Sequence, residues 1–500
     1  MVAYDQKQLA HHKPLLARKG LIAALNPRMQ SLGWSAAIRL RFAGDYLGAA
    51  ALLLALVKSI QFAIDSQVLF YDDSGAFLLN ALGYAFIPER SFVYSALIRV
   101  FSVSTHSLRA IVAMQMVMGG ITAWLLAFIL LRFFSVRPWI AILVALAFAF
   151  DPVQIVHEHL MLTETTAMLA VALFLATAVQ YLRTFSSGWL VTVSVLGIVL
   201  VSLRLVYVPV VLACAVLLPL GAYFRSSRRE PRTLAIALMV SCSSTLLLQI
   251  GFRDLTGRLA GREPAYQYRT GDFMVTLVAP LIEPEDAKEV RVAEAVRAQN
   301  QGGLPLSDAD FRTAQMWTTD GFVTRLHTVF HGDQRAANRA EDQLARAAIM
   351  RDPWGFVRLG FHTYLEYWRD IPQLDRILAK EHGTPPTPVV PENGVRMISA
   401  LFGVDVSNQH TLYTLSRRYH TLGRYWNVFL LASPLLAGLT LWPKPLMTEG
   451  AAPLFVWGLL LFAATFWGAS EAAYRYLHPF SFTGLAAAAA LADKWLPKSR

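Results

Sequence analysis

The chain alternates long apolar runs with short charged segments, which is typical of proteins that cross a membrane several times. The runs lie on both sides of a more polar middle region. The pattern predicts an all-α polytopic membrane protein with about ten transmembrane helices. We place them at Gly44–Ile64, Arg109–Leu131, Trp139–Phe150, Glu164–Leu182, Trp189–Leu203, Val206–Phe224, Thr233–Ile250, Tyr425–Trp442, Pro453–Trp467 and Leu477–Leu491.

Basic residues mark one side of this array. Seven Lys and Arg residues precede the first run, and four Arg residues lie between 225 and 232. Because cytoplasmic segments are enriched in Lys and Arg, we expect both termini in the cytoplasm. No apolar core followed by a small-residue cleavage site precedes the first run, so we expect no cleaved signal peptide. Both cysteines lie in apolar runs and do not indicate a disulfide framework.

This orientation divides the chain into five parts. They are a basic N-terminus (1–43), a transmembrane core (44–250) with a first external loop (65–108), an external domain (251–424), C-terminal transmembrane helices (425–492) and a cytoplasmic tail (493–500). In the first loop, Ala76–Ile87 and Phe92–Val103 are apolar but too short to span, so we expect helices along the membrane interface.

The middle region has a different composition from the rest. The whole chain is 55% hydrophobic and 16% charged with a net charge of +11, but 251–424 holds 21 Lys and Arg against 21 Asp and Glu. The basic excess therefore lies at the cytoplasmic ends, which argues against nucleic-acid binding. We expect helices at Ala336–Met350 and from Asp352 onward, the second interfacial, then a Pro-rich connector at Thr384–Pro391, and loop arginines that are solvated.

Several charged and polar residues fall on the external side in this topology. They lie in separate loops and at helix ends, and we expect them to share one cavity: Asp72, Asp73, Asp151, His157, Glu158, His159, Glu164, Arg204, Glu471, Tyr474, Arg475 and His478. A carboxylate there can take a proton from an acceptor, while arginines hold the phosphate of a lipid-linked donor. This set predicts chemistry at the membrane surface.

Several of these residues also have a purely structural interpretation. An Asp before Ser74 is a good helix N-cap, and Glu164 suits a helix N-terminus. The i, i+2 spacing of His157 and His159 differs from the i, i+4 spacing of helical zinc sites, which argues against a metal there. Arg204 and Arg475 could be interfacial anchors, and Lys58 is expected to snorkel toward the outer surface.

The order of these features resembles the GT-C-type membrane glycosyltransferases, particularly the branch with protein O-mannosyltransferases and lipid A aminoarabinose transferases. The resemblance covers roughly the first 250 residues and the last 35. It rests on an acidic residue after the first span, interfacial helices, a large external loop, and short steps at Leu162–Thr165, Arg204–Pro209 and Tyr474–Pro479. The chain departs from the family in its ten expected spans, where relatives often have eleven to thirteen, and the sequence of 251–424 matches none that we can assign.

The resemblance implies a transferase that takes a sugar from a polyprenyl-phosphate donor and passes it to a lipid, glycan or protein acceptor. By position, the catalytic base is Asp73 or Asp72, with Asp73 ahead. Donor or substrate contacts would come from Glu158, His159, Glu164, Arg204, Tyr474 and Arg475. Some relatives use a divalent metal and others do not, so metal dependence stays open. The expected location is a bacterial inner membrane with a periplasmic active site.

Other function classes remain open at this point. A lipid-sugar polymerase or ligase would share the donor, although such enzymes tend to rely on Arg and His in a large loop. A transporter or flippase of lipid-linked sugars would also have many spans, but should show internal repeats or interrupted helices near the midplane. A structural or assembly protein would tolerate loss of both aspartates.

Overall fold

The computed structural model of the chain is all-helical. It describes residues 27–70, 73–83, 87, 89–225, 230–302, 309–369, 392–403, 419, 422–441, 451–469 and 474–496. Within these ranges there is no strand, and one isolated backbone bridge joins Leu69 to Leu160. The all-α prediction is therefore confirmed.

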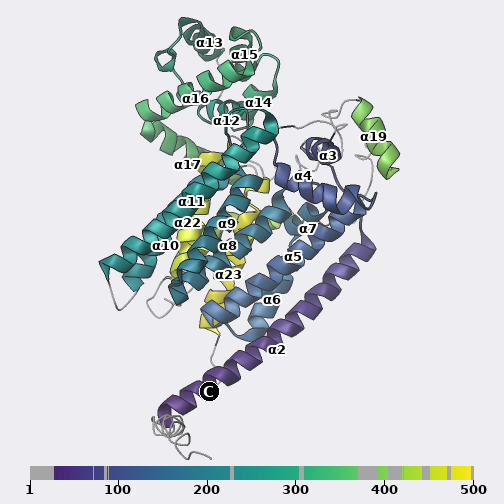
Figure 1. Cartoon of the computed structure of the whole chain (residues 1–500), viewed down its shortest axis with the longest axis vertical. Helices are drawn as coiled ribbons and strands as arrows, with labels where there is room; N and C mark the ends of the chain where they lie inside the picture. Colours follow the sequence, from purple (N-terminus) through teal and green to yellow (C-terminus); the bar gives the residue numbers. More distant parts are fainter. Residues whose placement is uncertain are drawn as a thin grey trace, which may run out of the picture.

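Long apolar helices lie side by side in a tilted bundle (Figure 1). Among them, α6, α11 and α23 begin with a proline in the first turn, where its missing N–H costs nothing. The bundle consists of α2 (Pro27–Ile64), α5 (Arg109–Ile129), α6 (Pro138–Ala149), α8 (Glu164–Thr184), α9 (Ser187–Leu203), α10 (Val208–Arg225), α11 (Pro231–Ala260), α21 (Gly423–Leu439), α22 (Ala451–Gly468) and α23 (Pro479–Trp495).

Five helical segments of the described chain are long and apolar enough to cross a membrane. They are Gly44–Ile64, Arg109–Phe134, Glu164–Thr184, Leu205–Arg225 and Pro231–Ala260, and a sixth results if α6 and α7 count as one bent span. Helices α9 and α22 are apolar but shorter. These lengths and compositions define an integral membrane protein.

Helix α7 (Pro152–His159) corrects one expectation from the sequence. We predicted an external loop after Asp151, but this segment is a helix bent by 49° from α6, and all eight of its residues are buried. Asp151 caps it by accepting a hydrogen bond from the Val153 N–H at 2.8 Å. The polar side chains of α7 are buried because they hydrogen-bond to one another and to neighbouring helices, which sequence hydropathy does not register.

The first external loop also folds more deeply than predicted. It contains α3 (Ser74–Leu82) and α4 (Phe92–Ile98), which continues as a π-helical turn at Arg99–Val103. The helices themselves match the prediction, but seven of the nine residues of α3 are buried. An interfacial helix would leave one face toward lipid or water. Helix α3 therefore packs inside the protein.

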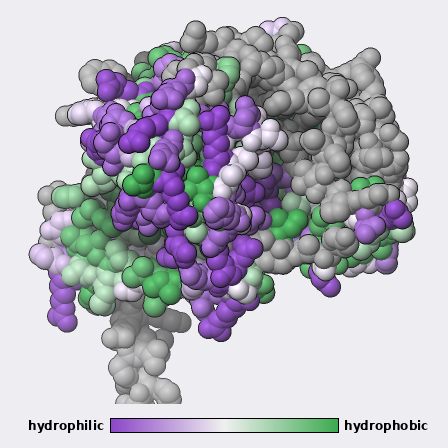
Figure 2. Space-filling view, turned by 90° about the horizontal axis from the view of Figure 1, so that it is seen from above, coloured by the Kyte–Doolittle hydropathy of each residue, from purple (hydrophilic) through white to green (hydrophobic). Residues whose placement is uncertain are grey.

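A small helical domain stands beyond one end of the bundle, the same end that carries α3 and α4 (Figure 1). It comprises α12 (Thr270–Leu277), α13 (Val290–Gln301), α14 (Ala309–Trp317), α15 (Phe322–Val329) and α16 (Gln334–Arg351). The domain has its own apolar core, which includes Val296, Leu326 and Leu344. Seen from above, the described surface at this end is largely hydrophilic (Figure 2).

The connections of this domain refine the predicted boundaries. Helix α11 continues ten residues past the expected end at Ile250, to Ala260. Helices α16 and α17 (Pro353–Arg369) confirm the two helices predicted there. Tyr364 of α17 packs edge-on against Phe466 of α22, with ring centroids 5.0 Å apart. The aromatic face of α17 thus contacts α22, which is why it resembles an interfacial segment in sequence.

Arg312 corrects the expectation that the arginines of the middle region are all solvated. It is fully buried and donates to the Thr363 hydroxyl at 2.7 Å, which links α14 to α17. The predicted connector at Thr384–Pro391 lies outside the described residues.

Candidate functional site

Asp73 lies where the chain enters α3, between two arginines from distant parts of the sequence. Its Oδ1 is 2.6 Å from Arg90 Nη2, and its Oδ2 is 3.4 Å from Arg475 Nη1. Asp73 makes no side-chain capping bond to α3, so the N-cap interpretation does not hold for this residue. The three side chains are 20–23% exposed, which leaves the group within reach of a ligand. Asp72 lies outside the described residues.

An aromatic ring extends this group to two further predicted residues. The guanidinium of Arg475 lies 5.2 Å from the ring centre of Tyr476, and that of Arg204 lies 4.9 Å from the same ring. Arg204 Nη1 in turn donates to Glu164 Oε1 at 3.0 Å. Asp73, Arg90, Arg475, Tyr476, Arg204 and Glu164 thus form one continuous cluster, which we call the Asp73 cluster.

The sequence therefore predicted four members of the Asp73 cluster, and the structure adds Arg90 and Tyr476. Arg90 could have been noticed because it follows the first aspartates within the same loop, but its side-chain direction has no sequence signal. Tyr476 was part of the Tyr474–Pro479 step that carried the family resemblance. The backbone of Tyr474 belongs to a 3-10 turn with Tyr476, and its side chain is outside the described part.

Backbone hydrogen bonds hold the first loop against the end of α7. The N–H of Leu69 donates to the carbonyl of His159 at 2.8 Å, and the N–H of Met161 donates to the carbonyl of Leu69 at 3.0 Å. The Ser74 hydroxyl, directly after Asp73, donates to the Met161 carbonyl at 3.0 Å. Asp73 is therefore positioned by backbone and Ser74 hydroxyl hydrogen bonds between the first loop and the segment around the end of α7, about 90 residues apart.

The electrostatics of the Asp73 cluster favour an ionised aspartate. Burial raises the pKa of the Asp73 carboxyl, but the positive charges of Arg90 and Arg475 outweigh burial and hold that pKa below its ordinary value. Elsewhere in the cluster, the buried Oε2 of Glu164 has no hydrogen-bond partner among the described atoms. The cluster thus offers arginines for an anion and a carboxylate that is free to accept another hydrogen bond.

Glu158 belongs to a second, deeper network. Its Oε2 is 2.9 Å from Lys58 Nζ, its Oε1 accepts from Gln154 Nε2 at 2.9 Å, and Gln154 Oε1 is 2.9 Å from His478 Nε2. Lys58 was expected to snorkel outward, but it is 5% exposed because Glu158 and the Ala149 carbonyl hold its ammonium group inside the bundle. This network connects α2, α7 and the start of α23.

The two histidines beside Glu158 face different partners, as their helical i, i+2 spacing predicts. His157 packs against His478, with ring centroids 4.6 Å apart. His159 Nδ1 is 2.7 Å from the Ile155 carbonyl oxygen, and its Nε2 is 3.2 Å from that of Asp65. Among the described residues, no side-chain hydrogen bond or ion pair links Glu158 or His159 to the Asp73 cluster, and their predicted role in donor binding stays a prediction.

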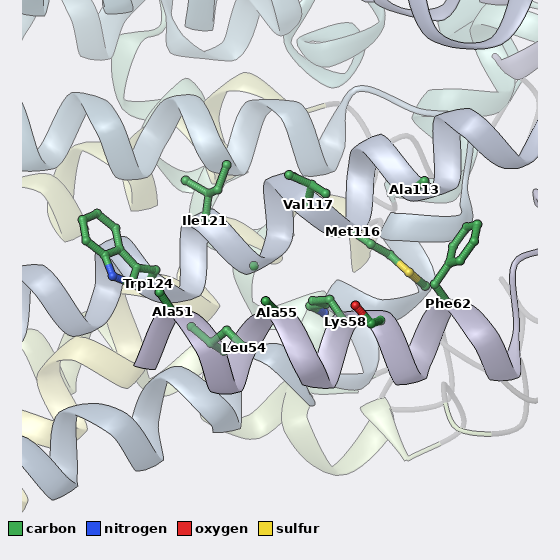
Figure 3. A pocket seen from close by; sticks show the side chains of 12 residues that line it. Ala51, Leu54, Ala55, Lys58, Phe62, Ala113, Met116, Val117, Ile121 and Trp124 are labelled. Atoms are coloured by element: carbon green, nitrogen blue, oxygen red, sulfur yellow. The ribbon is translucent and has the colours of Figure 1, made fainter. Parts of the chain in front are cut away.

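An apolar cavity of about 540 Å³ lies between α2 and α5. Its walls include Leu54, Phe62, Val117 and Trp124, and the stem of Lys58 reaches into it (Figure 3). Apolar walls of this kind accept hydrocarbon. The cavity adjoins the deeper network through Lys58.

No protein-family model matches the chain, and no curated protein matches it.

Proposed function

We propose that the chain is a GT-C-type membrane glycosyltransferase that moves a sugar from a polyprenyl-phosphate donor to a lipid, glycan or protein acceptor. The observation that carries this proposal is Asp73 between Arg90 and Arg475, partly exposed at one end of the bundle. A base and two permanent cations within hydrogen-bond reach suit acid–base catalysis beside a phosphate.

The proposed reaction is a direct displacement. The Asp73 carboxylate takes the proton from an acceptor hydroxyl or amine, and the acceptor atom attacks the anomeric carbon. The bond from that carbon to the phosphate oxygen breaks, and its electron pair leaves with the polyprenyl phosphate. Arg475 and Arg90 stabilise the charge that develops on the phosphate.

This arrangement also supplies a reason for the salt bridges of Asp73. Before the donor binds, both arginines pair with the aspartate and weaken it as a base. When the phosphate takes over one or both guanidinium groups, the pKa of Asp73 rises and the carboxylate becomes a better proton acceptor. Donor binding thus prepares the base.

The proposed placement in the membrane follows from charge and helix length. About ten spans result if α9, α21, α22 and α23 cross together with the longer helices and the α6–α7 pair. Both termini would then be cytoplasmic in a bacterial inner membrane, with the Asp73 cluster and 251–424 on the periplasmic side. The cavity between α2 and α5 would accept part of a hydrocarbon chain from the donor or from membrane lipid.

Reconstitution tests the proposal directly. We would incorporate the full chain into liposomes with a panel of radiolabelled polyprenyl-phosphate sugars and extracted acceptor lipids. We expect Asp73→Asn to lower transfer by at least about 100-fold, the usual contribution of a general base. Asp72→Asn is the matched control and should retain transfer. Undiminished transfer by Asp73→Asn would remove Asp73 as the base.

A transporter or flippase of lipid-linked sugars is the second candidate, because α6 and α7 form a broken helix beside the buried Lys58–Glu158 pair. The same liposomes distinguish it. A flippase would move the donor across the bilayer without acceptor and would do so in Asp73→Asn. A polymerase or ligase would instead transfer a whole glycan rather than one sugar.

A further inference from the structure

A second group of titratable side chains lies in the small domain, away from the Asp73 cluster. Asp272 comes from the first turn of α12, His327 from α15 and Glu341 from α16, and one ligand atom from each lies within 4.8 Å of the others. Asp272 and Glu341 are fully buried, while the His327 side chain is 20% exposed. The group is therefore enclosed but reachable from one side.

The local sequence forces α12 and α16 together at this point. A Cβ on Gly271 would lie 2.3 Å from the Asn338 carbonyl oxygen, so only glycine permits this approach. The Gly271 N–H also donates to the Asn338 side chain at 2.8 Å. This contact directs two acidic side chains, one on each helix, into the same buried space.

The distances within the group are long for hydrogen bonds. His327 Nε2 is 3.4 Å from Glu341 Oε1 and 3.6 Å from Asp272 Oδ1. Two ligands on one Zn²⁺, each about 2.0–2.1 Å from a tetrahedral ion, lie about 3.3 Å apart. Asp272 Oδ1, His327 Nε2 and both carboxylate oxygens of Glu341 have no hydrogen-bond partner among the described atoms.

The remaining contacts orient the ligand atoms. Arg269 Nη2 and Nε bind the other oxygen of Asp272, Oδ2, at 2.6 and 2.7 Å. This leaves Oδ1 directed toward His327. In metal sites, a residue outside the ligand set often orients a ligating carboxylate by hydrogen-bonding to it in this way. Arg269 pairs with Asp272 alone, so His327 is the one basic side chain beside Glu341 within this group.

We propose that Asp272, His327 and Glu341 bind a divalent cation that holds α12, α15 and α16 together. One imidazole and two carboxylates suit Zn²⁺ better than Mg²⁺ or Ca²⁺, which prefer oxygen alone. The fourth position is left to water. The site lies in a different domain from the Asp73 cluster and does not depend on the proposed glycosyl transfer.

Metal content and thermal stability of the full-length protein in detergent test this site. After chelator treatment and dialysis against Zn²⁺, we expect one more bound Zn²⁺ per chain in the wild type than in Glu341→Gln or His327→Gln. The wild type should also melt at a higher temperature with Zn²⁺ than without, and both variants should lack this increase. Arg269→Gln should weaken binding by about 10–100-fold, as loss of an outer partner does.

The matched control is Asp342→Asn, which removes the neighbouring acid of α16 and its contact with Arg346 but no proposed ligand. It should bind Zn²⁺ like the wild type. Since ligand variants can fail to fold, His327→Cys gives a second measurement: with Co²⁺ it should acquire a thiolate-to-cobalt absorption band that the wild type lacks. Equal Zn²⁺ content in wild type and Glu341→Gln, or no Co²⁺ band in a folded His327→Cys, would overturn the site.

Discussion

The bundle and the small domain both hold buried or half-buried carboxylates, but they neutralise them differently. In the bundle, Asp73 is paired with Arg90 and Arg475, Glu164 with Arg204, and Glu158 with Lys58. In the small domain, Asp272 and Glu341 share one histidine, and only Asp272 has an arginine. Arg cannot lose its proton in a protein, whereas His can.

This difference in the balancing charges suits the two regions to different tasks. The Asp73 cluster has fixed positive charge and partial exposure, which suits repeated binding and release of an anion. The group in the small domain is buried and short of positive charge, which suits permanent binding of a cation. A carboxylate therefore indicates a function only together with the groups that balance its charge.

The largest effect expected in the bundle comes from Lys58→Met. It leaves Glu158 charged and fully buried, and breaking a buried pair from one side costs about 3–5 kcal/mol. The apparent melting temperature in detergent should fall strongly. The double variant Lys58→Met with Glu158→Gln should recover much of the loss, and a double variant no more stable than Lys58→Met would contradict the pairing.

The next largest effect concerns the fixed charge of the Asp73 cluster. Arg475→Gln removes a charge-assisted contact worth about 1.5–3 kcal/mol, so kcat/KM for the donor should fall by about 10–100-fold. Zn²⁺ content should not change, because the two regions are separate. Arg99→Gln, which removes an exposed arginine from the first external loop, is the control and should leave kcat/KM unaltered.

Packing offers a smaller and more local test of the bundle. A Cβ on Gly119 would lie 1.8 Å from Glu158 Oε1, whereas one on Gly120 would meet only the stem of Lys58 at 3.4 Å. Gly119→Ala should therefore cost about 1–3 kcal/mol of stability, the usual range for overpacking. Gly120→Ala should be close to neutral. Equal melting temperatures for the two variants would contradict the geometry of the deeper network.

The smallest expected effect is a shift in pH dependence. The folded-state pKa of Asp73 is lower than its ordinary value, so its pairing stabilises the protein above about pH 4 and is lost as the pH falls through the lower folded value. Arg90→Gln removes one cation and raises that pKa. The acid limb of kcat/KM should therefore move to higher pH, and a pH profile that does not move would argue against Asp73 as the titrating base.

Much of the helical layout could be predicted from sequence because apolar runs and proline starts are local signals. Helix α17, which begins at Pro353, follows this rule. Helix α7 begins with Pro152 but was assigned to a loop, since its polar residues are satisfied by distant partners such as Lys58, 100 residues away, and His478, 324 residues away. Hydropathy alone assigns such a segment to solvent.

The sequence predicted only the part of the candidate site that gives a local signal. Asp73, Glu164, Arg204 and Arg475 stood out as charges at the ends of apolar runs. Tyr476, which lies between two of their guanidinium groups, carries no charge and gave no signal of its own. His327 was missed because its partners lie 55 and 14 residues away, a spacing that matches no local metal motif.

The extension of α11 past residue 250 has a geometric consequence for the small domain. Ten further helical residues raise the attachment point by about 15 Å and turn it by about 100° per residue. Any change in the length of α11 therefore changes both the distance of the small domain from the bundle and its orientation about the helix axis. Removing seven residues, close to two turns, would bring the domain closer to the bundle with nearly the same orientation about the helix axis. Removing two residues would rotate it by about 200° about that axis, toward the opposite side of the helix.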